Sequence, residues 1–295
     1  MKNISSNLRG KLKQNHVLAE HTSWKIGGPA EYFYEPANLE DLKLFLQGWK
    51  EKSITVFGAA TNVLIRDGGI KGLVIYLRSC LNELSELDGF TLRVEAGVGL
   101  SSLVQKCVHL GMIDAVFLAG IPGTVGGALA MNAGAYGDYI WNHVVAVETV
   151  NRSGEIKLRQ AQEFTAGYRQ VAGLAKDEWF VAAQLNFARG DRQEMERQIR
   201  EQLQKRKNSQ PLDFPSCGSV FRNPQGDYAA RLIEACGLKG KQIGGARVSE
   251  KHANFIVNCG GATAADVEAL MQEIMVAVKK DHNIDLIAEV RILGE

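Results

Sequence analysis

The sequence predicts a mixed α and β fold made of more than one compact unit. Three observations support this prediction. The chain has 295 residues, which is at the upper limit of what one hydrophobic core usually fills. Strand-like and helix-like segments alternate along its first half, which is typical of helices covering a sheet. Finally, the composition changes after Gly190, where a highly charged segment begins a new part of the chain.

In the first half of the chain, strand patterns and helix patterns follow one another. The aromatic run "EYFYEP" reads as a strand, and Asn38 is a helix N-cap type before "LEDLKLFLQGWKEK" at 39–52. The apolar runs at 54–58 and 72–77 read as two further strands. Residues 91–111 repeat the theme, with a strand followed by a helix.

The second half begins with strands and ends with helices. Residues 143–160 read as two strands around the turn "NRSG", and residues 178–189 as another strand. A charged helix is expected over 191–208, an amphipathic helix over 264–279, and a closing strand over 285–294. The amphipathic helix has a core stripe at helical spacing, formed by Val267, Leu270, Met271, Ile274, Met275 and Val278. We therefore expect a domain boundary at Gly190, with domains 1–190 and 191–295.

Composition excludes several function classes. The formal net charge is only +1, which gives no electrostatic support for a nucleic-acid partner. The chain shows neither a signal peptide nor a run of 18 apolar residues, so we expect a cytoplasmic protein without a membrane partner. Its 5 cysteines have no CxxC spacing and its 6 histidines no HxxxH pair, so no disulfide framework and no metal site is expected. The cysteines are expected to be small buried side chains.

A glycine-rich passage, "LAGIPGTVGGALAMNAGAYG" at 118–137, is the first candidate for a ligand site. It contains no Lys, Arg, Asp or Glu, and its glycines allow backbone N–H groups to converge on an anion. The passage lacks the Walker A lysine and the GxGxxG order, so it predicts a different backbone cradle for a phosphate or pyrophosphate. The alternative is that the glycines serve only tight turns and close packing. For this passage alone, and equally for the second glycine loop described next, ligand binding and this structural role are equally well supported.

A second glycine loop, "GAATNVLIRDGG" at 58–69, follows directly on the strand "ITVFG", where ligand loops of α/β sheets lie. The two loops together favour a large nucleotide ligand. The stretch "GVGLSS" at 97–102 imitates a dinucleotide fingerprint, but Ser102 stands at the third glycine position. We interpret it as a strand-to-helix turn.

Six motifs in this order resemble the UDP-N-acetylenolpyruvoylglucosamine reductase family: "TSWKIGGPAEYF", "GAATNVLIRDGG", "AGIPGTVGGALAMNAGAYG", "GYRQ", "CGSVFRNP" and "LIAEVRILG". The resemblance covers nearly the whole chain. It implies an α+β fold, with a two-lobed FAD-binding domain of the vanillyl-alcohol oxidase type over 1–190 and a smaller C-terminal α/β substrate-binding domain over 191–295. It also implies the branch without a tyrosine loop over the substrate, since no such loop is recognisable between Arg169 and Ser219.

The resemblance also implies a site. Non-covalent FAD is expected mainly on backbone groups of the two glycine loops. The matching positions are Gly58, Ala59, Ala60, Thr61, Asn62, Val63, Leu64, Gly120, Ile121, Pro122, Gly123, Thr124, Gly126, Gly127, Ala128, Asn132, Gly134, Ala135 and Tyr136. Arg169, Ser219 and Glu289 match the family's catalytic residues. Tyr168, Asn223 and His252 match positions at the substrate, although His252 stands where other members have glutamine, and a structural role for it is at least as well supported.

The implied reaction adds a hydride and a proton across the enolpyruvyl double bond of UDP-N-acetylglucosamine enolpyruvate, with NADPH as the reductant and FAD as the hydride carrier. Negative charge then develops toward the substrate carboxylate. Arg169 suits this charge because a guanidinium is permanently charged and binds a carboxylate through two hydrogen bonds. Glu289 is expected to be kept partly neutral, since only a protonated carboxyl donates a hydrogen bond to the developing anion. Ser219 is expected to donate the proton, because its flanks lack the GxSxG elbow of a nucleophile.

Other readings remain open on the residues alone. They are a different flavin-linked oxidase on the same scaffold, a nucleotide-binding regulator without catalysis, and a serine hydrolase. "GSVFRN" and "AEVR" argue against the first, and the combination of Arg169, Ser219 and Glu289 argues against the second. No base accompanies a nucleophile elbow for the third. His21 is a possible point of covalent flavin attachment on related scaffolds, but the family holds FAD non-covalently. A monomer is expected.

Overall fold

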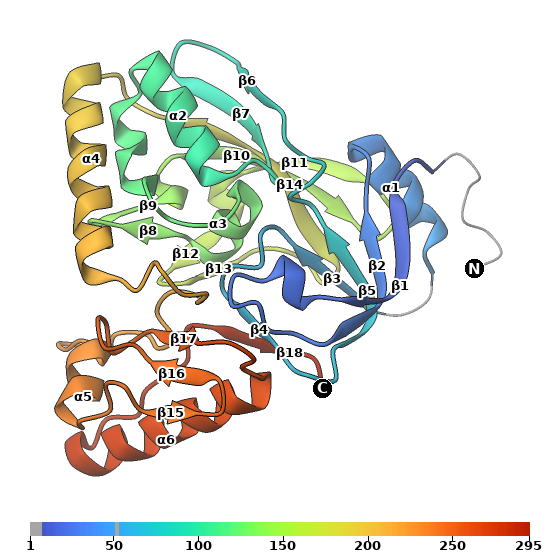
Figure 1. Cartoon of the computed structure of the whole chain (residues 1–295). Helices are drawn as coiled ribbons and strands as arrows, with labels where there is room; N and C mark the ends of the chain where they lie inside the picture. Colours follow the sequence, from blue (N-terminus) through green and yellow to red (C-terminus); the bar gives the residue numbers. More distant parts are fainter. Residues whose placement is uncertain (1–7, 51–52) are drawn as a thin grey trace. The chain divides into compact units, whose positions relative to one another are not determined.

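The computed structural model describes residues 8–50 and 53–295, which form two compact units (Figure 1). The first unit contains residues 8–14, 32–50, 53–59 and 72–204. The second contains residues 15–31, 60–71 and 205–295. Among the described residues, no helix has both the length and the apolar character needed to cross a membrane.

A four-stranded sheet with one covering helix forms the smaller lobe, most of it in the first unit. Its strands follow the order β1 (Lys11–Val17), β2 (Pro29–Glu35), β5 (Ile70–Tyr76) and β3 (Ile54–Phe57), with β3 parallel to β5. Helix α1 (Leu39–Gly48) begins where the Asn38 side chain accepts a hydrogen bond from the Asp41 N–H, at 3.0 Å. Its Phe45 ring stacks on Tyr34 at a centroid distance of 3.7 Å. Aromatic stacking in a buried core therefore attaches α1 to the sheet.

A five-stranded antiparallel sheet forms the larger lobe of the first unit. Its order is β11 (Ile156–Gln160), β10 (Val144–Asn151), β14 (Glu178–Asn186), β7 (Thr91–Glu95) and β6 (Leu84–Glu86). Helices α2 (Leu100–Leu110) and α3 (Val125–Met131) contribute apolar residues to the core of this sheet, which also contains Phe117 and Trp141. Residues between Leu118 and Ala133 of the glycine-rich passage pack in this core.

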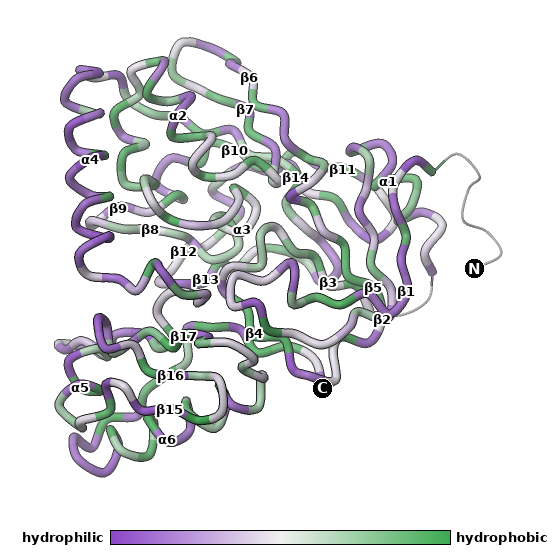
Figure 2. The backbone as a smooth tube through the Cα atoms, viewed as in Figure 1, coloured by the Kyte–Doolittle hydropathy of each residue, from purple (hydrophilic) through white to green (hydrophobic). Residues whose placement is uncertain are grey.

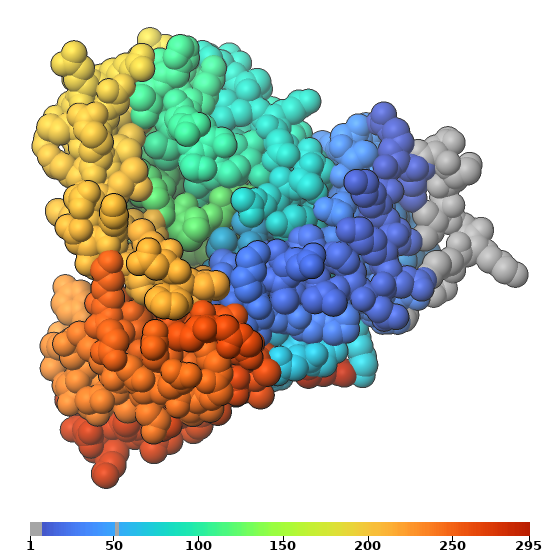
Figure 3. All heavy atoms as spheres, in the orientation of Figure 1, coloured from blue at the N-terminus to red at the C-terminus, as the bar shows by residue number. Residues whose placement is uncertain are grey.

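Short hairpins and a long helix complete the first unit. The hairpins are β8 (Gly134–Ala135) with β9 (Asp138–Tyr139), and β12 (Thr165–Gly167) with β13 (Gln170–Ala172). Helix α4 (Arg192–Ser209) is hydrophilic along nearly its whole length (Figure 2) and stands on the surface (Figure 3), with Met195 as its buried residue. Its charges are therefore mainly a solvated face, as the sequence predicts.

The second unit is built around α6 (Ala264–His282) and a three-stranded antiparallel sheet. The sheet contains β15 (Gln242–Ile243), β16 (Ala246–Val248) and β17 (Ile256–Asn258), and α5 (Ala229–Ala235) packs nearby in the same core. Strand β4 (Val63–Ile65) pairs in parallel with β18 (Arg291–Leu293). Trp24 is fully buried here, and its Nε1–H donates to the Ile256 carbonyl at 2.8 Å. The early segment "TSWKIGG" therefore belongs to this late core.

Most predicted elements are confirmed, including the α6 stripe, whose members are all buried except the partly buried Met275. The closing strand is shorter than predicted, because only Arg291–Leu293 finds a strand partner. Helix α3, which lies inside the glycine-rich passage, is not predicted from the sequence. The prediction of buried cysteines is confirmed for Cys107 and Cys217, whereas Cys80 and Cys236 are partly buried, and it is wrong for the exposed Cys259. The division at Gly190 into two ligand-binding domains stays a prediction, since the compact units are defined by contacts and place most of α4 in the first unit.

Candidate functional site

The two glycine loops meet within the first unit. Gly58 follows directly on β3, and a Cβ atom placed on it would lie 2.1 Å from the Thr124 hydroxyl oxygen. Thr124 is the N-cap of α3 and accepts a hydrogen bond from the Gly127 N–H at 3.4 Å. Only glycine at position 58 allows this approach, since any side chain would overlap Thr124. The first residue of one proposed ligand loop thus lies against Thr124 of the other.

The rest of the 58–64 loop belongs to the second unit. The backbone carbonyls of Ala60 and Thr61 accept hydrogen bonds from the N–H and hydroxyl of Ser23, at 3.5 and 3.3 Å. Val63 and Leu64 lie in β4. Small side chains stand at the start of this loop, at Gly58, Ala59 and Ala60.

The end of the glycine-rich passage is a tight hairpin beside α3. Asn132 ends α3 in the left-handed conformation, with φ 41°, and is buried. Tyr136 and Gly137 form the turn between β8 and β9, both with positive φ, and Tyr136 is half-exposed. Positive φ at a tyrosine is uncommon and marks a backbone held by its surroundings.

The predicted catalytic arginine lies in the turn of a second hairpin of the same unit. Gly167 pairs with Gln170, so Tyr168 and Arg169 form a two-residue turn. Arg169 alone of these two has positive φ, 58°, at the position where a type II turn normally has glycine. Its guanidinium Nη1 donates to the Gly134 carbonyl at 3.4 Å and lies over the Tyr168 ring at 5.3 Å. The structure therefore brings Tyr168 and Arg169 to the end of the glycine-rich passage.

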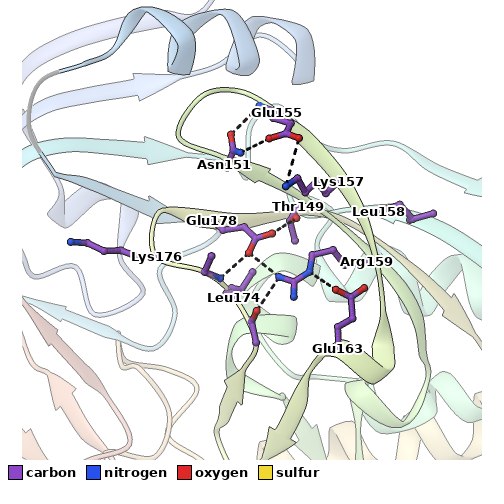
Figure 4. A pocket seen from close by; sticks show the side chains of 12 residues that line it. Thr149, Asn151, Glu155, Lys157, Leu158, Arg159, Glu163, Leu174, Lys176 and Glu178 are labelled. Carbon is purple, nitrogen blue, oxygen red and sulfur yellow. Dashed lines mark hydrogen bonds and ion pairs between the residues drawn. The ribbon is translucent and has the colours of Figure 1, made fainter.

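A partly buried ion-pair network, exposed at Glu163, lies at the base of that hairpin (Figure 4). The Arg159 guanidinium donates to the carboxylates of Glu178 and Glu163, at 2.8 and 3.0 Å, and to the Gly173 carbonyl at 2.9 Å. Burial alone would raise the pKa of Glu178, but hydrogen bonds from Thr149, the Ala175 N–H and Arg159 outweigh burial and lower it. The network thus holds an ionised carboxylate beside the strand that leaves the hairpin.

These residues also line a cavity of about 650 Å³. Its charged lining is largely engaged internally, since Arg159 pairs with two glutamates and Lys157 with Glu155 (Figure 4). No predicted site residue lines it. Because its charges mostly neutralise one another, we interpret it as part of the support for the hairpin.

In the second unit, the structure brings Ser219 and Glu289 onto paired segments. The Glu289 N–H donates to the Val220 carbonyl at 2.8 Å, and Phe221 forms an antiparallel bridge with Ala288. The Asn62 side chain donates to the Glu289 carbonyl at 3.1 Å. One predicted cofactor residue and two predicted catalytic residues therefore lie together in this unit.

Cys217 lies just before these paired segments in the chain, and the pKa of its thiol depends on their surroundings. Burial, reinforced by the Glu289 carboxylate, raises the pKa of the Cys217 thiol. A protonated, buried thiol is inert as a nucleophile. The cysteine next to the predicted proton donor is thus a structural residue.

The predicted substrate residues Asn223 and His252 both make local contacts. Asn223 is exposed, and its Oδ1 accepts from the Ala229 N–H at 3.1 Å, at the start of α5. The His252 Nδ1 accepts from the Asn254 N–H at 3.3 Å, and its ring meets the Phe255 ring edge at 4.7 Å. Burial lowers the pKa of His252, so its imidazole stays neutral at pH 7. These contacts fit the structural role that the sequence left open for His252.

Asn254 is the residue that sequence reasoning missed. It is buried, and its amide donates to the Phe221 carbonyl at 2.8 Å and accepts from the Phe221 N–H at 3.0 Å. Its own carbonyl accepts from the Val220 N–H at 2.9 Å. Asn254 therefore replaces a strand partner for the segment that carries Ser219. The one sequence signal for this role is weak: Asn254 stands directly before the apolar run "FIVN".

Two family models and known relatives match this chain. The chain matches the family model for an FAD binding domain over residues 30–158 and that for the UDP-N-acetylenolpyruvoylglucosamine reductase C-terminal domain over residues 210–293. UDP-N-acetylenolpyruvoylglucosamine reductases from Coxiella burnetii (strain Dugway 5J108-111) and Legionella pneumophila (strain Paris) are 51% and 48% identical to it. Each alignment covers 97% of this chain, with 97% and 95% of the relative.

A solved structure extends the similarity to three dimensions. The crystal structure of UDP-N-acetylenolpyruvylglucosamine reductase from Thermus caldophilus has 32% sequence identity and a TM-score of 0.83, covering 97% of this chain and 99% of that one. The predicted α+β fold class, with an FAD-binding domain and a C-terminal reductase domain, is confirmed. The chain belongs to the UDP-N-acetylenolpyruvoylglucosamine reductase family.

Proposed function

We propose that Arg169, Ser219 and Glu289 carry out the reduction of UDP-N-acetylglucosamine enolpyruvate to UDP-N-acetylmuramate in this chain, with NADPH as the reductant. The chain is an FAD-dependent oxidoreductase of peptidoglycan synthesis by its family. The observation that carries the proposal is the backbone pairing of Val220 with Glu289, because it joins the segments of two predicted catalytic residues that are distant in sequence.

The two glycine loops fit an FAD ligand. Gly58 lies against Thr124 without a side chain, and neither 58–64 nor 118–137 contains a Lys, Arg, Asp or Glu. Backbone of 58–64 and of 120–137 would hold the cofactor, which suits a pyrophosphate bound without cationic side chains. When bound, FAD carries a hydride from NADPH to the substrate. We propose non-covalent binding, which predicts that acid precipitation releases the flavin from the protein.

Arg169 would stabilise the charge that develops on the substrate carboxylate. The reduction places a hydride on the vinyl carbon remote from the carboxylate, and the electron pair of the double bond moves toward the carboxylate. A guanidinium supplies two parallel hydrogen bonds and a permanent charge for that group. The hydrogen bond from the Arg169 side chain to the Gly134 carbonyl supports this role, since a donor already held in place needs less reorganisation during the reaction.

Ser219 would then give its hydroxyl proton to the carbon next to the carboxylate, which completes the addition and leaves a serine alkoxide that regains its proton from water before the next turnover. Glu289 in its neutral form would donate a hydrogen bond to the intermediate. Paired backbone fixes the Ser219 and Glu289 segments relative to each other, which favours a shared task at one reacting group. Tyr168 and Asn223 are proposed substrate contacts, and His252 is either a further substrate contact or a structural residue, the role that its contacts with Asn254 and Phe255 fit. We further propose a monomer that works in the cytoplasm.

The test is an anaerobic reaction in two steps. The purified holoenzyme is first reduced with NADPH, and loss of flavin absorbance near 450 nm is followed. The enolpyruvyl sugar nucleotide is then added, and the expected result is rapid return of the absorbance with stoichiometric formation of UDP-N-acetylmuramate. UDP-N-acetylglucosamine, which lacks the enolpyruvyl group, is the control. Failure of the substrate to reoxidise the flavin would overturn the proposal.

A further inference from the structure

Asn132 uses both ends of its side-chain amide, and one end reaches the hairpin that carries Arg169. Its Nδ2 donates to the Gly167 carbonyl at 3.1 Å, and its Oδ1 accepts from the Trp141 N–H at 3.4 Å. Gly167 is the residue directly before the Tyr168–Arg169 turn. A buried amide with both ends bonded is an orienting contact, since loss of either partner leaves an unsatisfied polar group.

The backbone of Asn132 is fixed independently of that amide. Asn132 ends α3 in the left-handed conformation, and its N–H donates to the Ala128 and Leu129 carbonyls. Asparagine tolerates this conformation better than most residues with side chains. These hydrogen bonds fix the backbone from which the Asn132 side chain extends. Trp141, which donates to that side chain, is itself held by a hydrogen bond from its Nε1 to the Leu129 carbonyl, at 2.8 Å.

The same short segment meets the hairpin a second time. Arg169 Nη1 donates to the carbonyl of Gly134, two residues beyond Asn132. The turn is thus fastened once through its backbone at Gly167 and once through the Arg169 side chain. Both contacts lead to the end of the glycine-rich passage that is proposed to hold the cofactor.

We propose that Asn132 is a positioning residue for Arg169, which sets the direction of the guanidinium by holding the Gly167 carbonyl. This inference rests on the proposed catalytic role of Arg169. It differs from the role that the family resemblance implies for Asn132, a direct contact with FAD. The positive φ of Arg169 explains why the turn needs an additional hydrogen bond at Gly167, because a non-glycine residue keeps this conformation only where its surroundings impose it.

The first test is Asn132→Gly, which keeps the left-handed C-cap and removes the amide. Asn283→Gly is the matched control, because Asn283 is also a left-handed C-cap, that of α6, with φ 55°. Single-turnover reduction of substrate by the NADPH-reduced holoenzyme is measured. We expect a fall of about 10- to 100-fold for Asn132→Gly, the loss typical of a misplaced catalytic group, and a change below about twofold for the control.

The second test is a double-mutant cycle with Arg169→Met. If Asn132 acts through Arg169, Asn132→Gly should have less than about a twofold further effect once Arg169 is gone. A fully multiplicative effect would overturn the inference, as would an Asn132→Gly rate close to that of the natural protein. A parallel loss of bound FAD would assign Asn132 to the cofactor instead. If Arg169→Met itself retains normal activity, the proposed function of Arg169 fails, and that outcome is distinct from the others.

The third test is Asn132→Asp, which keeps the shape and the acceptor for Trp141 but removes the donor to Gly167. A protonated aspartic acid regains a donor, so the rate relative to the natural protein should rise as the pH falls. Burial favours that neutral form. A ratio that stays constant with pH would contradict the role of the Gly167 hydrogen bond, and a merely structural defect predicts that constancy.

Discussion

The Glu289 N–H donates to the Val220 carbonyl at 2.8 Å, so the residue after Ser219 is paired directly with Glu289. The pairing continues where the Arg222 N–H donates to the Ile287 carbonyl at 2.9 Å. A shift of either segment would therefore move both predicted catalytic residues.

Ser219→Ala should abolish substrate reduction and leave NADPH oxidation by the bound flavin within about twofold. The reason is that the hydroxyl proton is needed only in the second half-reaction. Stopped-flow absorbance measures the two half-reactions separately. Ser216→Ala, in the same loop, is the control and should keep both rates. Equal loss in both half-reactions of Ser219→Ala, with FAD retained, would rule out a proton donor.

Glu289→Gln should keep near-normal substrate reduction, because an amide also donates a hydrogen bond to the developing anion. Glu289→Ala removes the donor and should lower the rate by about 10²-fold or more, the effect of losing one such donor. The pH–rate profiles of both variants and the natural protein are compared. Complete loss of activity in Glu289→Gln at every pH would show that the ionisable carboxyl itself is required.

Asn254→Ala should destabilise the protein by about 2–4 kcal/mol, since it leaves both backbone groups of Phe221 buried without their partner. Urea unfolding measures the change in the free energy of unfolding. Asn142→Ala removes an exposed hydrogen bond to Asp138 and should change stability by less than about 0.5 kcal/mol. If the two variants lose the same small amount, Asn254 does not hold the Ser219 segment.

Glu178→Gln should reduce the dependence of stability on acid pH. The pKa of Glu178 is lowered in the folded protein, so the folded state binds its proton less readily than the unfolded chain, whose glutamate pKa is about 4.3. Its stabilisation is fully present above that unfolded value and is lost as the pH falls through the folded pKa. Unfolding between pH 3 and 7 should therefore show a smaller acid loss in the variant.

Glu196→Gln is the control for Glu178, because Glu196 forms an exposed i,i+4 pair with Arg192 on α4. Such exposed pairs contribute little, so its acid profile should follow that of the natural protein. An unchanged profile in Glu178→Gln would mean that the Arg159 network does not depend on the charge of Glu178.

Local patterns predicted most elements and the candidate loops. Helix α6 follows from the apolar stripe between Val267 and Val278, and β3 followed by Gly58 predicts a ligand loop. Helix α3 was missed, because its Val125–Met131 segment contains adjacent glycines and lies inside a passage that reads as loop. Its N-cap at Thr124 and its packing in the core of the larger lobe outweigh that weak propensity.

By itself, the sequence determined the fold class, the family and the identity of the candidate catalytic residues, because these depend on local periodicity and on the order of short motifs. Tertiary structure alone decided which residues come together. Three sets of hydrogen bonds show this, because each joins residues that are distant in the chain: Asn254 with Phe221, Arg159 with Glu178, and Asn132 with Gly167. The physical reason is that a buried polar group needs a hydrogen-bond partner, and packing determines which residue is near enough to be that partner. The periodicity of the sequence does not specify this residue.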